Sequence, residues 1–140
     1  MFKLFLAVAI VVGGTRFQTV PFTTIASGQQ SGVEKQREVV VRTAAEWKAL
    51  WKEHSPDDPI PAIDFSKSMV AGIFLGVRDT GGYGVTIASV DREGKGVVVR
   101  WREQKPAPSA MVSQALTFPF VLVRIDGAGA GAVTFQRSGG

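Results

Sequence analysis

The sequence predicts an α+β domain: a mostly antiparallel sheet of six to seven strands, curled or closed into a partly open barrel, with one helix packed against it. Three observations lead to this fold class. Short apolar segments rich in β-branched residues recur along the chain, separated by hairpin-length connections. A single segment has a helical period instead. The 140-residue chain shows no repeat and no linker that would separate two domains, so residues 18–137 are expected to form one globular domain.

Seven segments have the composition of strands. The segment 68–77 is apolar on both alternating faces, which is typical of a central strand covered on each side. The segment 97–102 alternates Val97, Val99 and Trp101 with Val98 and two arginines, which predicts one wetter face. The other expected strands are 19–26, 37–42, 85–90, 118–126 and 133–136. Glycine, proline and polar residues mark the connections at 27–32, 56–62, 91–96, 105–109 and 126–131.

The segment 44–54 is the one expected helix. Thr43 followed by Glu46 forms a capping box, in which the hydroxyl accepts from an early helix N–H and the carboxylate reaches back. Ser55-Pro56 disfavours further helix. One helix face then carries residues spaced i, i+3, i+4 and i+7: Trp47, Leu50, Trp51 and His54.

Composition excludes several classes of function. The chain has no cysteine, so disulfides, thiolate metal ligands and a cysteine nucleophile are all absent. The formal net charge is +4, but the basic residues are interleaved with glutamates rather than gathered in a stripe. A nucleic-acid partner is therefore not expected.

The N-terminal residues 1–17 resemble an export signal. Lys3 precedes a nine-residue apolar run, 4–12, which is too short to span a bilayer but fits a signal-peptide core. The alternative is a hydrophobic first strand. The export interpretation predicts a secreted or periplasmic protein with no stable membrane span in its mature form.

No residue set in the sequence predicts catalysis, a cofactor or a metal site. The single histidine, His54, lies on the tryptophan face of the helix and is expected to pack there and to interact with the helix C-terminal carbonyls. Asp57, Asp58 and Asp64 lack the ligand spacing of a calcium loop, and Asp64 is expected to accept turn N–H groups. No Gly-x-Ser-x-Gly elbow exists, and the glycines of 127–131 precede no helix.

The segment Arg78-Asp-Thr-Gly-Gly-Tyr-Gly84 has two interpretations. It can be a turn whose tyrosine packs back on the sheet. It can also be a recognition loop, because glycines permit close backbone approach and loops on rigid scaffolds often carry function. In that case the contact residues would be Arg78, Thr80, Gly81, Gly82 and Tyr83, with Phe120 as a neighbouring aromatic.

Several motifs, in order along the chain, resemble the protease complex subunit PrcB family. They are VPFTTIASGQQSG at 20–32, RTAAEWKALW at 42–51, DFS at 64–66, FLGVRDTGGYGV at 74–85 and ALTFPF at 115–120. The resemblance covers 20–135. It implies an exported bacterial domain without established catalysis, whose namesake accompanies and stabilises a surface protease complex. The family is expected to have a tyrosine after the proline at position 119. This chain has Phe120 there, which lacks the tyrosine hydroxyl.

The leading hypothesis is therefore a non-catalytic exported domain that binds another protein, with a protease or protease complex as the candidate partner. The alternative is a small-ligand or glycan-binding module that uses Arg78 and Tyr83 with Phe120 or Trp101. A weaker alternative is a protease inhibitor acting through a loop.

Overall fold

The computed structural model describes residues 18–127 and 131–139. The expected leader at 1–17 lies outside these residues, as does part of the glycine-rich turn at 126–131. In chain order the elements are β2 (Gln18–Thr19), β3 (Phe22–Gly28), β4 (Arg37–Val41), α1 (Ala44–His54), β5 (Ser68–Phe74), β6 (Gly84–Glu93), β7 (Gly96–Gln104), β8 (Phe120–Asp126) and β9 (Val133–Arg137).

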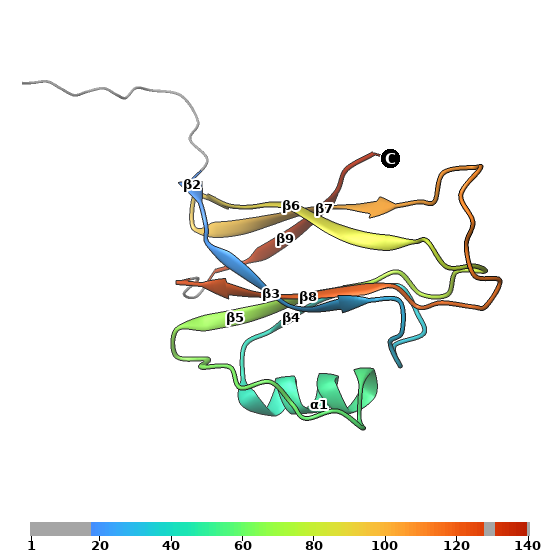
Figure 1. Ribbon diagram of the computed structural model, residues 1–140. Coiled ribbons are helices and arrows are strands. Elements are labelled where there is room, and N and C mark those ends of the chain that lie inside the picture. The colour runs from blue at the N-terminus through green and yellow to red at the C-terminus, as the bar shows by residue number, and fades with distance from the viewer. Residues whose placement is uncertain (1–17, 128–130, 140) are drawn as a thin grey trace, which may run out of the picture.

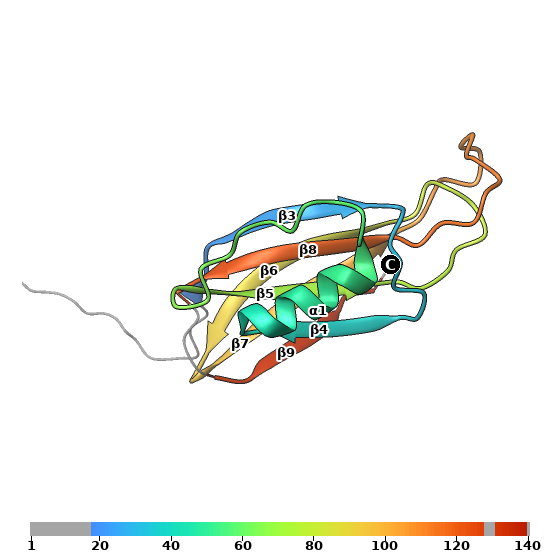
Figure 2. The same ribbon diagram turned by 90° about the horizontal axis from the view of Figure 1, so that it is seen from below.

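These elements form three layers (Figure 1). One four-stranded sheet has the order β2-β6-β7-β9, and the other has the order β3-β8-β5-β4. Helix α1 covers the outer face of the second sheet and lies over β4 and β5 (Figure 2). The α+β class and the packed helix predicted from the sequence are confirmed.

The predicted curled sheet or partly open barrel is wrong. Two open sheets lie face to face, and the described strand pairs are antiparallel except for β7 with β9. The physical reason lies in β5 and β8, which occupy the centre of their sheet and are apolar on both faces. One face packs against the other sheet and the opposite face packs against α1, so the sheet buries both faces without curling.

The described residues contain eight strands, one more than expected, because the first expected strand divides in two. β2 pairs with β6 in one sheet, and β3 pairs with β8 in the other. At the crossing, the amide of Val20 donates to Val90 O at 2.8 Å, and Pro21 O accepts from the amide of Asp126 at 3.0 Å. The chain is thus tied to both sheets, and proline, which has no N–H to donate, sits at the break between the strands.

The core between the sheets comes from alternate residues of the central strands. Val97, Val99 and Trp101 point into it, while Arg102 on the opposite face is exposed, which confirms the wetter face predicted for β7. The Trp101 indole Nε1 donates to Glu38 Oε2 at 2.7 Å. The other buried members are Val20, Met69, Ala71, Ile73, Leu75, Val90, Val121, Val123 and Ile125.

A second core lies between α1 and its sheet. The helix runs over the predicted residues, and the Glu46 amide donates to Thr43 Oγ1 at 3.1 Å. The Glu46 carboxylate reaches back to the amide of Arg42 at 2.8 Å, one residue before the N-cap. The predicted apolar face of the helix is buried: Trp47, Leu50, Trp51 and His54. Burial of the two indoles stabilises the fold by several kcal/mol, on the order expected for their apolar area. The proline loop covers the indoles, since Pro61 O and Asp58 O accept from their N–H groups at 2.9 Å.

Strand boundaries differ from prediction where glycine backbone decides them. β5 ends at Phe74 because Gly76 takes φ +79° and turns the chain, so the expected strand loses its last residues. The hairpin between β6 and β7 is shorter than predicted. Both strands extend through the expected connection, leaving two turn residues that include Gly94 at φ +60°.

Candidate functional site

The segment 78–84 lies at one end of the molecule, where two long connections meet (Figure 1). Residues 75–83 link β5 to β6, and residues 105–119 link β7 to β8. We call the surface made by these two connections the loop surface. Gly84 is the first residue of β6, so the recognition candidates sit directly above a rigid sheet strand.

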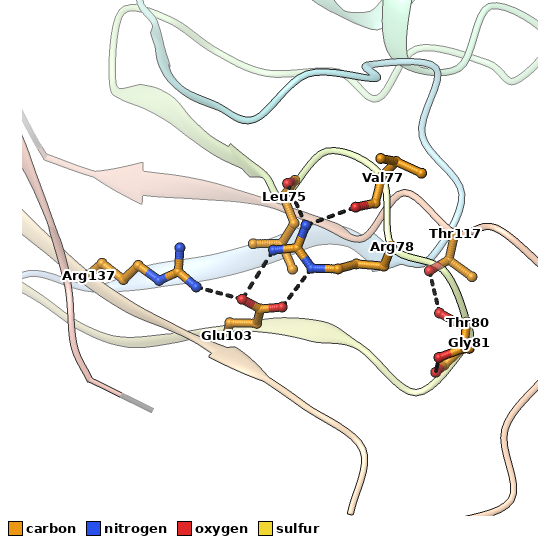
Figure 3. Close-up of polar contacts among 8 residues, drawn as sticks. All are labelled: Leu75, Val77, Arg78, Thr80, Gly81, Glu103, Thr117 and Arg137. Atoms are coloured by element: carbon orange, nitrogen blue, oxygen red, sulfur yellow. Dashed lines mark hydrogen bonds and ion pairs between the residues drawn. The ribbon is translucent and has the colours of Figure 1, made fainter.

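The two connections are fastened together by hydrogen bonds. The amides of Arg78 and Thr117 each donate to the other residue's carbonyl, at 2.8 and 2.9 Å. The Thr117 hydroxyl donates to Thr80 O at 2.9 Å (Figure 3). The amide of Gly81 donates to Ser113 O at 3.0 Å. The loop surface is therefore held from both sides rather than supported only at its strand ends.

A third segment joins this arrangement through Gln29. Its side-chain Oε1 accepts from the amide of Gly82 at 3.1 Å, and its backbone O accepts from the amide of Phe118 at 2.8 Å. Sequence reasoning placed Gln29 in a flexible connection at 27–32. In the structure β3 continues to Gly28, and the next residue bridges both loops.

The two central glycines are required by close packing. A Cβ on Gly81 would lie 2.9 Å from Ser113 Oγ. A Cβ on Gly82 would lie 2.8 Å from carbons of both Pro106 and Val112, and Gly82 also takes φ +93°, which side chains disfavour. The sequence predicted that the backbone of these glycines approaches another group closely. In the structure that group is the other connection of the loop surface, not a ligand.

Arg78 forms the electrostatic centre of the loop surface (Figure 3). Its guanidinium makes two bonds to the carboxylate of Glu103, at 2.8 and 3.1 Å, and donates to the carbonyls of Leu75 and Val77. Arg137 adds a third bond to Glu103 at 2.5 Å. Hydrogen bonding from Arg78 lowers the pKa of Glu103 despite burial, and the same hydrogen bond raises the pKa of Arg78. The charge of Arg78 is thus engaged within the fold.

Tyr83 remains half-buried beside this centre. The Arg78 guanidinium carbon lies 5.8 Å from the centroid of its ring, within range of a cation–π contact. Among the described residues, the Tyr83 hydroxyl has no hydrogen-bond partner. Because Tyr83 is only partly buried, part of its side chain is accessible to a binding partner.

Phe120 does not lie with the other recognition candidates. It is 6 % exposed and packs in the core under α1, with its ring centroid 4.3 Å from that of His54. Trp101 is buried in the other core. Among the recognition candidates, the structure brings together Arg78, Thr80, Gly81, Gly82 and Tyr83. Phe120 lies in the core under α1, and Trp101 lies in the core between the two sheets.

Sequence reasoning missed the most exposed apolar side chains of the loop surface. Met111 is 99 % exposed, Leu116 is 56 % and Val77 is 47 %. The described residues contain one other large exposed apolar side chain, Ile60, at 45 %. A signal was available, because residues 106–119 of this connection contain no charged side chain, which is unusual for a surface connection.

The other residues considered for chemistry have structural partners. His54 is buried, and its Nδ1 lies 2.8 Å from Ser31 Oγ rather than at a helix carbonyl. Burial is the main reason that the pKa of His54 is lowered, with Asp58 opposing it. Asp64 accepts from the amide and hydroxyl of Ser66, as expected for a turn, and these bonds lower its pKa.

A broad hollow of about 1020 Å³ lies at the ends of β5 and β8. Its charges are mixed: the guanidinium of Arg124 pairs with Asp126 at 3.0 Å, and Lys67 is exposed beside them. The remaining lining residues are Arg42, Asp64, Phe65, Ser66, Ser68, Met69 and Gly127.

Within residues 18–127 and 131–139, no group of three acidic or histidine side chains is placed to hold a metal ion. No helix in this part of the chain has the length and apolar character needed to cross a membrane.

Comparison with known proteins gives one family match. The family model described as PrcB C-terminal matches residues 69–126. No curated protein and no solved structure gives a match. The matched segment begins in β5, includes the hairpin and both connections of the loop surface, and ends with β8. The resemblance predicted from the sequence is therefore confirmed over residues 69–126, the part of the chain that the PrcB C-terminal family model matches.

Proposed function

We propose that this chain is a non-catalytic, exported domain that binds another protein through the loop surface. The observation that carries the proposal is the grouping of Val77, Met111 and Leu116 on two connections that are fastened to each other. Exposed apolar side chains gathered on one end of a domain favour contact with another protein.

The fastening of the loops supports binding energetically. A loop that is ordered before binding loses less conformational entropy when it meets its partner. The bonds from Thr117 to Thr80 and from Gly81 to Ser113 provide this order without occupying the exposed side chains of Met111 and Leu116.

The family match and the sequence resemblance favour a protease or a protease complex as the partner. The leader pattern supports export to the periplasm or the cell exterior, which fractionation and N-terminal sequencing of the protein would test. The proposal assigns the single histidine a packing role, because His54 is buried against Ser31 and the rings of Trp51, Phe74 and Phe120.

Capture from the native envelope fraction tests the proposal. We expect the tagged protein to co-purify with a partner, and Met111→Ser with Leu116→Ser to abolish this capture. Ile60→Ser is the matched control, because Ile60 is similarly exposed but lies beside Trp51 and Pro56, away from the loops. Recovery of monomer alone, or equal capture by all variants, would contradict the proposal. Titration of the purified protein against the captured protease separates stabilising binding from inhibition.

A small-ligand site is the second candidate, and the hollow at the ends of β5 and β8 favours it. A thermal-shift screen with saccharides and small anions would reveal such a ligand. Loss of the stabilisation in Lys67→Ala would place the ligand in the hollow, whereas loss in Tyr83→Ala would place it on the loop surface. Stabilisation unaffected by either change would exclude both places.

A further inference from the structure

In the part of the chain that the structure describes, strand β6 has no neighbouring strand along most of one edge. It has ten residues, but β2 pairs only with Asp91 and Arg92, and Val20 adds one bond to Val90 O. The chain then leaves this edge to enter β3 in the other sheet. Among the described residues, no strand lies beside residues 84–89 on this side.

Hydrogen bonding elsewhere in the sheet shows which backbone groups face the open edge. The N–H and C=O of one strand residue point to the same side, and successive residues alternate. Trp101 O accepts from the amide of Ser138 at 2.8 Å, on the side of β7 away from β6. Ile87 of β6, which is paired with Trp101, therefore points its own N–H and C=O away from β7 and toward the open edge. Val85, which is paired with Glu103 two residues along, does the same.

The side chains along this edge are those of an incomplete core. Val85 and Ile87 pack against the core between the sheets but remain only partly buried. Edge strands commonly carry charge or proline as protection against pairing. Residues 84–90 carry neither. The irregular register at Ala88, between Ile87 and Ser89, is the one protective feature, and it confines regular pairing to residues 84–87.

We propose that residues 84–87 of β6 form a docking edge for an extended segment of a partner protein. The segment adds as a strand in line with β2, and its apolar side chains at alternate positions complete the burial of Val85 and Ile87. This inference rests on the proposed protein-binding function. The docking edge is continuous with the loop surface, since Gly84, the first residue of β6, directly follows Tyr83.

A synthetic peptide can test the edge without knowledge of the partner. The probe is an acetylated peptide of eight residues that alternates valine and threonine between terminal lysines. At saturating peptide, hydrogen exchange followed by NMR should slow at least about tenfold at the amides of Val85 and Ile87, which point toward the open edge. The amide of Thr86, which faces β7, should change little. Protection at β3 in place of β6, or no binding at millimolar peptide, would overturn the proposal.

A proline at an outward-facing position blocks an incoming strand without removing a bond to β7. We expect Val85→Pro to abolish peptide binding. Ser27→Pro is the matched control: Pro119 O accepts from the amide of Leu75, so Val121, two residues along, also faces β5, and its partner Ser27 faces the open edge of the other sheet. Ser27→Pro should bind the peptide as the unaltered protein does. Equal binding by both variants would refute docking at β6, and the exchange measurement decides the matter if Val85→Pro fails to fold.

Partner capture separates this inference from the proposed function. If Met111→Ser with Leu116→Ser abolishes capture from the envelope fraction while Val85→Pro retains it, the loop surface binds the partner and strand addition is wrong. Loss of capture in both variants, together with protection of Val85 and Ile87 by the peptide, supports both. Loss of capture in Val85→Pro alone supports docking at β6 and contradicts the loop surface as the binding site.

Discussion

Replacing Glu103 with glutamine measures how much the charged centre of the loop surface contributes to stability. The Glu103 side chain is 3 % exposed and accepts two bonds from Arg78 and one from Arg137. Glutamine keeps the shape but loses the charge, and it turns an N–H group toward the arginines. Glu103→Gln should therefore destabilise the fold and loosen both connections of the loop surface.

The expected magnitude follows from the burial of each partner. Removing one member of a buried ion pair costs about 3–5 kcal/mol. The side chains of Arg78 and Arg137 are 23 % and 40 % exposed, so water compensates part of this loss. We expect the free energy of unfolding to fall by about 2–3 kcal/mol, a range reduced for that solvation.

Urea unfolding followed by tryptophan fluorescence measures this difference, because all three tryptophans are buried. Glu53→Gln is the control: Glu53 forms one ion pair with Arg37, and both side chains are well exposed, 50 % and 39 %. Glu53→Gln should lower the free energy of unfolding by less than about 1 kcal/mol. The reasoning is refuted if Glu103→Gln costs no more than Glu53→Gln.

The charged centre also predicts a response to acid. The pKa of Glu103 is lowered in the folded protein, so the unfolded chain binds its proton first as the pH falls. The stability that Glu103 contributes is therefore complete above the unfolded pKa of about 4.5 and is lost as the pH falls through the folded value.

Three further predictions concern separate elements. Gly82→Ala should lower stability by more than about 1 kcal/mol, since it combines positive φ with a clash at Pro106; Gly94→Ala, with positive φ in open space, should cost less in the same urea titration. Thr43→Ala removes the N-cap and should cost about 1 kcal/mol, with a lower midpoint of thermal unfolding; an unchanged midpoint would contradict this role. Because burial lowers the pKa of His54, its stability contribution is present above about pH 6.5 and is lost as the pH falls through the folded value. His54→Gln should therefore flatten the stability profile below about pH 6.5, and a profile as steep as before would show that another group titrates.

The sequence by itself determined the local elements of this protein. The capping box and the i, i+3, i+4, i+7 stripe fixed α1 to the residue, since both depend on groups within a few positions of one another. Two-sided apolar composition likewise identified β5 as a central strand. The motifs of 74–85 and 115–120 pointed to the family later matched over 69–126.

Only the tertiary structure decided how distant segments combine. It divided residues 18–28 between two sheets, placed Gln29 between the loops and set Arg78 on Glu103, 25 positions away. It also buried Phe120 apart from Tyr83. The physical reason is that strand pairing and burial join residues far apart in sequence, and neither period nor spacing within one segment specifies which sheet edge or layer that segment will meet.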